Sequence, residues 1–271
     1  MKPALQIRVQ RYGWDKASRY YDDSWKEQLK PAQDRLLDMA ALKQGEDVIE
    51  TACGSGLVTF RAAMAVAPDG QVVATDLSEE MIRRAASLAE EKQISNVIFK
   101  RMNAEQIELN GRHFDAALCG LGLMYVPDPV KALSEKNRLL KPDGRAVVAI
   151  WGERRRCGWA EIFPIVDRRV SSDVCPLFFQ QGTGNTIVHT FSQAGFKDIE
   201  VDRFHVTLSY PNQELALTAA FSGGPVALAY EKFDEETRAG VHAEYLDSIA
   251  EFRVGDGYEI PGEFVVASGR K

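Results

Sequence analysis

The chain has 271 residues, 45% hydrophobic and 27% charged, a composition typical of a globular protein long enough for one large domain. Its net charge of −6 argues against a dedicated nucleic-acid-binding protein, because such proteins carry a basic surface. No apolar run approaches the roughly 20 residues that span a bilayer, and residues 1–8 lack the apolar core of a signal peptide, so we expect a cytoplasmic protein. The four cysteines form no CxxC pair, and we expect no metal site.

The N-terminal part of the sequence predicts a cap segment followed by a helix. Residues 1–29 mix aromatic and polar side chains, and we expect them to cover the rest of the fold. Pro31 suits the first position of a helix, and Gly45 would follow its end.

Apolar strands and helices then alternate up to residue 150. The expected strands are 47–50, 71–75, 96–101, 114–119 and 145–150, and the expected helices are 57–67, 78–92 and 129–140. This alternation predicts an α/β fold with a doubly wound, mostly parallel sheet.

The pattern changes after residue 150. We expect a helix from residue 186, a strand at 199–210, a helix at 225–252 and a strand at 263–268. The last two strands predict an antiparallel pair that completes a seven-stranded sheet. The predicted organisation is a cap segment (1–29), a cofactor-binding core (30–150), a cap insertion (151–185) and a completion of the core (186–271) with a helical cap excursion at 212–254.

The most informative stretch is a short apolar strand that enters a glycine-rich turn, Val48 to Leu57. Asp76 ends the next strand, twenty residues beyond Gly56, the spacing at which an acid meets the ribose hydroxyls of an adenosine cofactor. Glu50 lies at the tip of the first strand. A carboxylate there would repel a pyrophosphate but would favour the ammonium group of S-adenosylmethionine. The residues therefore favour S-adenosylmethionine over a dinucleotide.

In these motifs the sequence resembles the class I S-adenosylmethionine-dependent methyltransferases, and looks most like the small-molecule branch that includes the ubiquinone and menaquinone C-methyltransferases. The matching segments are Glu50 to Gly56, Asp76, Asn103 to Glu105, Phe114 to Gly120, Leu140 to Gly144 and Ala194 to Phe196. The resemblance implies a Rossmann-like fold and transfer of a methyl group from S-adenosylmethionine to an O, N, S or C atom of a small-molecule acceptor, with S-adenosylhomocysteine as the product.

Two positions depart from the family pattern. Ala52 replaces the usual first glycine, so the turn must have a conformation that alanine tolerates there. Asn103 replaces the usual aspartate, but its amide can still accept a hydrogen bond from the adenine amino group.

The resemblance also implies site residues. Glu50, with help from Tyr20, is expected to hold the amino-acid end of the cofactor, and Asp76 its ribose. The full set expected around the cofactor is Tyr20, Glu50, Ala52, Gly54, Gly56, Asp76, Leu77, Met81, Asn103, Ala104, Glu105, Cys119, Gly120 and Leu121. The aromatic residues expected around a partly apolar or aromatic acceptor are Trp25, Trp159, Phe178, Phe179 and Phe221. Candidates for a catalytic acid or base are Tyr20, His189 and His205.

Three other functions remain open. An NAD(P)-dependent reductase would also use glycines and an acid at strand ends, but Glu50 and the absence of a third glycine argue against it. A nucleic-acid methyltransferase disagrees with the acidic charge. A non-catalytic partner protein with a methyltransferase fold would need a spoiled cofactor site. The acceptor, the attacked atom and the oligomeric state cannot be inferred.

Overall fold

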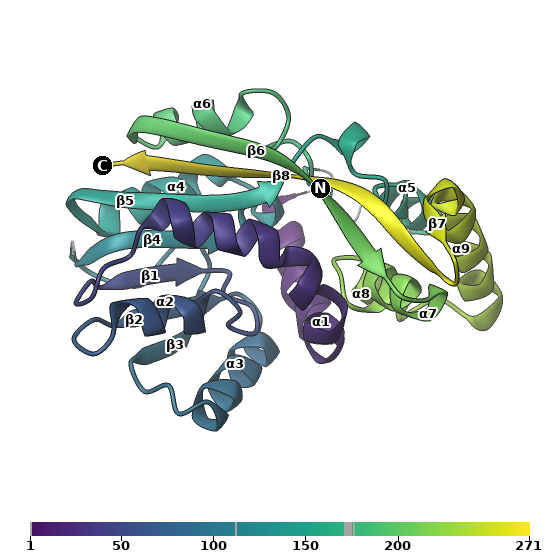
Figure 1. Cartoon of the computed structure of the whole chain (residues 1–271), viewed down its shortest axis with the longest axis horizontal. Helices are drawn as coiled ribbons and strands as arrows, with labels where there is room; N and C mark the ends of the chain where they lie inside the picture. Colours follow the sequence, from purple (N-terminus) through teal and green to yellow (C-terminus); the bar gives the residue numbers. More distant parts are fainter. Residues whose placement is uncertain (1, 112, 171–174, 176) are drawn as a thin grey trace.

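The computed structural model describes residues 2–111, 113–170, 175 and 177–271, and it contains one mixed sheet with helices on both faces (Figure 1). The strand order is β3-β2-β1-β4-β5-β8-β6, with the two-residue β7 paired to β8. The strands are β1 Val48–Thr51, β2 Val72–Asp76, β3 Val97–Arg101, β4 Phe114–Gly120, β5 Leu140–Trp151, β6 Lys197–Tyr210, β7 Arg253–Val254 and β8 Gly257–Arg270. Strands β1 to β5 run parallel, and β8 is antiparallel to both β5 and β6. The predicted fold class is confirmed.

Nine α-helices occur in the described residues: α1 Pro3–Ala40, α2 Thr59–Val66, α3 Glu79–Glu91, α4 Pro129–Leu139, α5 Ile162–Asp167, α6 Thr186–Gln193, α7 Gln213–Leu217, α8 Ala227–Tyr230 and α9 Glu235–Ser248. Side chains cap several of them where the sequence predicts a start. The Ser78 hydroxyl accepts from the Met81 amide before α3, and the Asp128 carboxylate accepts from the Lys131 amide before α4. Among the described helices, none is both long and apolar enough to cross a bilayer.

Helix α1 differs from the prediction. Residues 3–40 form one continuous helix with Pro31 inside it, not a cap segment followed by a new helix. Proline removes one backbone hydrogen bond from a helix. The helix continues because its second half is held by packing: Ala32 and Leu36 are completely buried against the sheet.

The helical excursion near the C-terminus also differs from the prediction. The single helix expected at 225–252 is divided into α8 and α9, because the Asp234 carboxylate accepts a hydrogen bond from the Thr237 amide and begins a new helix there. Figure 1 shows α7, α8 and α9 gathered at the far end of the long strands β6 and β8. Within the expected cap insertion, residues 171–174 and 176 lie outside the described residues.

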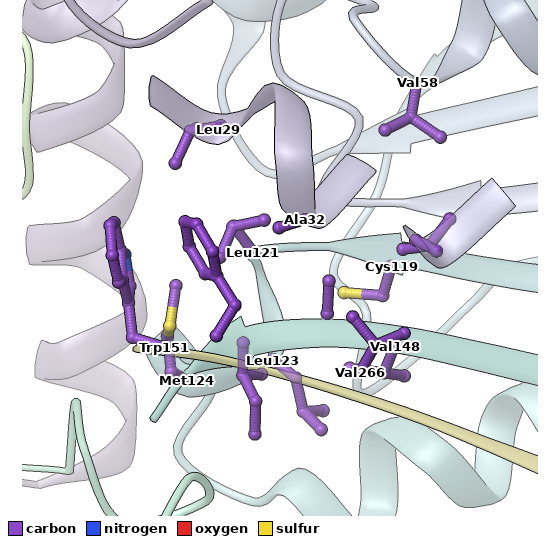
Figure 2. Packing of buried hydrophobic residues seen from close by; sticks show 14 of the residues in the cluster. Leu29, Ala32, Val58, Cys119, Leu121, Leu123, Met124, Val148, Trp151 and Val266 are labelled. Atoms are coloured by element: carbon purple, nitrogen blue, oxygen red, sulfur yellow. The ribbon is translucent and has the colours of Figure 1, made fainter. Parts of the chain in front are cut away.

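A continuous hydrophobic cluster joins α1 to the sheet (Figure 2). Leu29 and Ala32 contribute from α1, Val148 from β5 and Val266 from β8. Cys119, near the end of β4, lies within this cluster with only 2% of its surface exposed. The cluster fixes the second half of α1 against the sheet, so that the first half extends past the carboxyl ends of the parallel strands, which is where ligands bind in such sheets.

Candidate functional site

A cavity lies where β1, β2 and β4 end, and the first half of α1 covers it; we call it the strand-end pocket. Its walls are Ile7, Gln10, Trp14, Tyr21, Ala52, Gly54, Asp76, Leu77, Met81, Met102, Asn103, Ala104, Gly120, Leu121, Gly122, Tyr125, Val126 and Pro127. Nine of these were predicted from the sequence: Ala52, Gly54, Asp76, Leu77, Met81, Asn103, Ala104, Gly120 and Leu121. Asp76 is the one charged residue among the described walls.

The glycine-rich turn has three residues with left-handed backbone. Gly54 and Gly56 have φ angles of 55° and 94°. At Gly56 a Cβ atom would lie 2.6 Å from the Phe60 ring, so glycine is required there, but this residue shapes the turn and does not line the pocket. Ala52 also has a positive φ of 54°, so the turn that alanine was expected to tolerate has a left-handed conformation there, which costs alanine free energy.

Asp76 is anchored by the backbone around it. Its Oδ2 accepts from the Gly54 amide at 2.9 Å, and its Oδ1 accepts from the Ser78 amide at 2.8 Å. Burial raises the pKa of this carboxyl to about 6, although the backbone hydrogen bonds oppose that rise. A carboxylate offers about four acceptor positions, so Asp76 retains capacity for hydroxyl groups that enter the pocket.

Glu50 lies beneath the turn and is not a wall of the pocket. Its side chain points to the start of α2, where Oε2 accepts from the Thr59 hydroxyl at 2.6 Å. Burial raises the pKa of Glu50 to about 8, and the charge of Asp76 adds to the effect. The structure therefore does not support direct contact of Glu50 with a ligand. Only when it loses its proton does Glu50 add negative potential below the pocket, which would then favour a cation.

Tyr21, and not Tyr20, faces the pocket. Tyr20 is 42% exposed, with the Arg19 guanidinium 5.7 Å from its ring centroid. The helical phase of α1 explains this correction, since Ile7, Trp14 and Tyr21 repeat every seven residues on one face. Burial raises the pKa of Tyr21 strongly, and the nearby acids, Asp22 first, raise it further.

Two aspartates tie α1 to the loops that form the pocket. Asp15 accepts from the Ser78 hydroxyl at 2.6 Å and from the Glu80 amide at 3.2 Å, at the start of α3. Asp22 accepts from the Ser55 hydroxyl in the glycine-rich turn and pairs with Arg84 at 2.6 Å. Helix α1 is therefore a cover held by specific bonds on both sides of Asp76.

Two other predicted cofactor residues support the walls from behind. Glu105 accepts from the Asp128 amide at 2.6 Å and joins the loop after β3 to the start of α4. It does not reach the pocket, whereas Asn103, which accepts from the Glu105 amide at 3.0 Å, does. Cys119 is also absent from the walls, because its side chain is in the core. The structure therefore does not support direct contact of Glu105 or Cys119 with a ligand in the pocket.

A second cavity, which we call the aromatic chamber, adjoins the strand-end pocket. Its walls are Trp14, Tyr21, Trp25, Leu29, Leu121, Met124, Tyr125, Trp151, Trp159, Phe178, Gly224 and Pro225. Four of these also line the strand-end pocket: Trp14, Tyr21, Leu121 and Tyr125. Leu121 has a left-handed φ of 62°, a rare conformation for a bulky residue, directly at this junction.

The structure places three of the five predicted acceptor residues in the chamber: Trp25, Trp159 and Phe178. Phe179 contacts the Trp159 and Phe178 rings from outside. Phe221 belongs to a π-helical turn and packs against Tyr230 and Tyr245, away from the chamber.

The candidate catalytic histidines are distant from both cavities. His189 lies on α6 and His205 on the edge strand β6; both are exposed, and neither lines a cavity. With Tyr20 also outside, none of the three acid–base candidates is supported by the structure.

Comparison with known proteins agrees with this geometry. A family model described as a methyltransferase domain matches residues 42–155, which include β1 to β5. Nocamycin O-methyltransferase of Saccharothrix syringae is 24% identical over 258 residues, 89% of this chain and 91% of that protein. Demethylmenaquinone methyltransferase of Staphylococcus carnosus is 29% identical over 194 residues, 66% of this chain and 79% of that protein. Phosphoethanolamine N-methyltransferase 2 of Haemonchus contortus, solved with S-adenosyl-L-methionine, has a TM-score of 0.58 at 18% identity, over 91% of this chain and 52% of that chain.

The parallel sheet, the glycine-rich turn and the acid at the end of β2 define a Rossmann-like protein that binds an adenosine cofactor at its strand ends. The methyltransferase-domain model matches the segment that holds β1 to β5, so the chain is similar there to the class I methyltransferases, enzymes that take their methyl group from S-adenosylmethionine. The resemblance stated from the sequence is confirmed.

Proposed function

We propose that the protein transfers a methyl group from S-adenosylmethionine in the strand-end pocket to a small-molecule acceptor in the aromatic chamber. The observation that carries this proposal is the junction of the two cavities: Trp14, Tyr21, Leu121 and Tyr125 line both. A donor in one cavity and an acceptor in the other would meet there.

The walls of the strand-end pocket fit this cofactor and do not fit a dinucleotide. No Lys, Arg or His occurs among the described walls, so nothing there would neutralise a pyrophosphate. The Asp76 carboxylate instead favours the ammonium group and the sulfonium, and Glu50 would add to this effect when it is ionised. Asp76 is positioned to accept from the ribose hydroxyls, and Leu77, Met81 and Asn103 would surround the adenine.

The sulfonium of the bound cofactor supplies an activated methyl group. The protein therefore has to align the acceptor and exclude water. Trp14 stacks edge-on against Tyr21 and Tyr125, with ring centroids 5.8 and 5.1 Å apart, and these rings fix the width of the junction. Their π faces can also stabilise a cation.

We further propose that the cap comprises residues 1–29, 151–185 and 212–254, as expected from the sequence. Each segment contributes to the chamber: Trp25 comes from the first, Trp159 from the second and Pro225 from the third. A partly apolar or aromatic acceptor suits these walls. Two relatives named above are, by their names, a nocamycin O-methyltransferase and a demethylmenaquinone methyltransferase, and small-molecule acceptors are what this chamber would admit.

Titration calorimetry tests the cofactor assignment. We expect S-adenosylhomocysteine to bind and NAD⁺ to show no heat. Asp76→Asn should weaken the binding of S-adenosylhomocysteine by about tenfold, since a charge-assisted hydrogen bond contributes roughly 1.5–3 kcal/mol. Tight NAD⁺ binding without S-adenosylhomocysteine binding would reverse the assignment.

A further inference from the structure

The aromatic chamber contains many hydrogen-bond donors and almost no bases. Seven of its twelve described walls are aromatic, and none is Asp, Glu, His, Lys, Arg or Cys. The polar side-chain groups of its walls are the indole N–H groups of four tryptophans and the phenol groups of Tyr21 and Tyr125. An indole can only donate, so these walls are suited to a ligand that accepts.

One of these donors has no acceptor in the structure. Trp159 is 6% exposed, and its Nε1 is buried without a hydrogen-bond partner among the described residues. Leaving a buried N–H unpaired costs free energy, and a ligand oxygen that reaches this N–H would recover it. The rings of Trp25, Trp151 and Phe178 all contact Trp159, so its indole is held in place.

The two phenols of the chamber are poor bases at neutral pH. Burial raises the pKa of Tyr21 and of Tyr125 well above the ordinary value for a phenol, so both keep their protons. Neighbouring elements hold further titratable or charged groups, and none of them lines the chamber: Asp15, Asp22, Glu50, Asp76, Cys157, Cys175, Arg203 and Glu263. Glu263 is paired with Arg203 at 2.7 Å, and Asp22 with Arg84.

We propose that the acceptor is an oxygen acid, carried on a flat and largely apolar skeleton, that enters the chamber already ionised. This inference rests on the proposed function. The acid loses its proton to solvent before it binds. Its anionic oxygen then forms a bond to the methyl carbon while the carbon–sulfur bond breaks, and the electron pair of that bond returns to sulfur, which becomes the neutral thioether of S-adenosylhomocysteine.

The electrostatics of the chamber support this order of events. An anion in an apolar cavity is unfavourable on its own, but the sulfonium at the junction offers an opposite charge at close range, where a low dielectric strengthens the attraction. The Trp159 N–H, as a donor to an anion, adds a charge-assisted hydrogen bond. No proton acceptor is then required from the protein.

A series of naphthalene acceptors tests the inference: 2-naphthol, a more acidic nitro-2-naphthol, 2-naphthoic acid and 2-naphthylamine. At pH 7 we expect kcat/KM to be at least about tenfold higher for the nitronaphthol than for 2-naphthol or the amine, equivalent to 1.4 kcal/mol in the barrier. For each naphthol, the inflection in the pH profile should follow the pKa of that acceptor.

Trp159→Phe gives a second test on the protein itself. We expect kcat/KM for the ionised acceptor to fall about tenfold or more, with the affinity for S-adenosylhomocysteine within about twofold of the unaltered protein. Trp25→Phe removes an indole from the same chamber and should cause a smaller loss. If Trp159→Phe does not fold, the pH profiles of the unaltered protein decide the question.

Several outcomes would overturn the inference alone. The first is an inflection in the pH profile at one fixed pH for both naphthols, which would reveal a base in the enzyme. The second is a higher kcat/KM for the amine than for the naphthols. The third is binding of S-adenosylhomocysteine with no methylation of any oxygen acid in the series. Failure to bind S-adenosylhomocysteine would instead overturn the proposed function together with this inference.

Discussion

A Cβ atom placed on Gly122 would lie 2.2 Å from the Cβ of Ala52, so the alanine in the glycine-rich turn depends on the glycine that follows β4. Both residues line the strand-end pocket. The family usually has a glycine at position 52. The methyl group of Ala52 fits because Gly122, seventy residues later in the sequence, has no side chain.

This pair gives the first prediction. Gly122→Ala should lower the free energy of unfolding by about 1–3 kcal/mol, because the added methyl group overpacks the pocket floor. Ala52→Gly alone should change it by less than about 1 kcal/mol, since relief of the left-handed alanine is offset by the flexibility of glycine. In a double-mutant cycle measured by denaturant unfolding, Ala52→Gly should restore most of the loss. Simple additivity of the two changes would contradict the contact.

The second prediction compares adjacent tyrosines. Tyr21→Leu should weaken S-adenosylhomocysteine binding by about tenfold. The buried ring is a wall of the pocket, and its loss removes roughly 1.5 kcal/mol of binding free energy from apolar burial. Tyr20→Leu is the matched control and should leave the affinity within about twofold, since its ring is exposed. Calorimetry on both variants measures the difference. Equal losses of affinity in the two variants would contradict the placement of Tyr21, and not Tyr20, on the side of α1 that faces the pocket.

The third prediction concerns pH. The pKa of Glu50 is raised to about 8 and that of Asp76 to about 6, both above their unfolded values. Groups with raised folded pKa values stabilise the fold at low pH and lose that contribution as pH rises through the folded pKa. Without ligand, stability should therefore fall between pH 5 and 8, and Glu50→Gln should reduce that fall by about 1–3 kcal/mol.

Ligand binding should have the opposite pH dependence. The cofactor brings an ammonium group, which favours the ionised acids, so the affinity for S-adenosylhomocysteine should rise over the same interval. Thermal melting with and without ligand at several pH values measures both trends. A ligand-induced increase in Tm that does not grow with pH would contradict the placement of these acids.

The fourth prediction concerns a lysine in the core. Lys136 on α4 is completely buried, its Nζ has no partner among the described residues, and burial lowers its pKa. Lys136→Met should raise the free energy of unfolding at pH 7 by about 1–3 kcal/mol, because an unsatisfied polar group is removed from the core. The advantage should shrink at alkaline pH, where the unfolded lysine also loses its proton.

The exposed Lys131 on the same helix offers the control for this change. Lys131→Met should alter stability by less than about 0.5 kcal/mol in the same denaturant titration. A destabilised Lys136→Met variant would show that the lysine has a partner that the structure does not record.

The central strands could be predicted because β1, β2 and β4 are short and apolar, and because Asp76 and Gly54 have fixed places at strand ends. The first half of α1 could not, since its buried face is polar or small: Gln6, Gln10 and Gly13 give no hydrophobic period. The expectation of Tyr20 came from the family resemblance, and without the helical phase of α1 nothing in the sequence analysis corrected it to Tyr21. The repeat of Ile7, Trp14 and Tyr21 was the signal that could have corrected it.

The walls of the aromatic chamber were predicted only in part for a different reason. Aromatic content identifies residues that pack, but it does not distinguish a chamber wall from its support. Phe178 lines the chamber and Phe179 stands behind it, a difference set by one step along the chain. Likewise Phe221 points elsewhere because of the π-helical turn, which sequence periodicity does not reveal. The cytoplasmic location stays a prediction.

The position of β8 between β5 and β6 has a consequence for biosynthesis. A nascent chain that has exposed only residues 1–256 holds β5 and β6 with no strand between them, because residues 257–270 pair with both. Each would present unpaired backbone groups, the kind of edge that promotes association between chains. Until β8 inserts, the growing protein is thus most exposed to misassembly near the β6 edge of its future sheet, and a chaperone that shields those strands would raise the yield of folded enzyme.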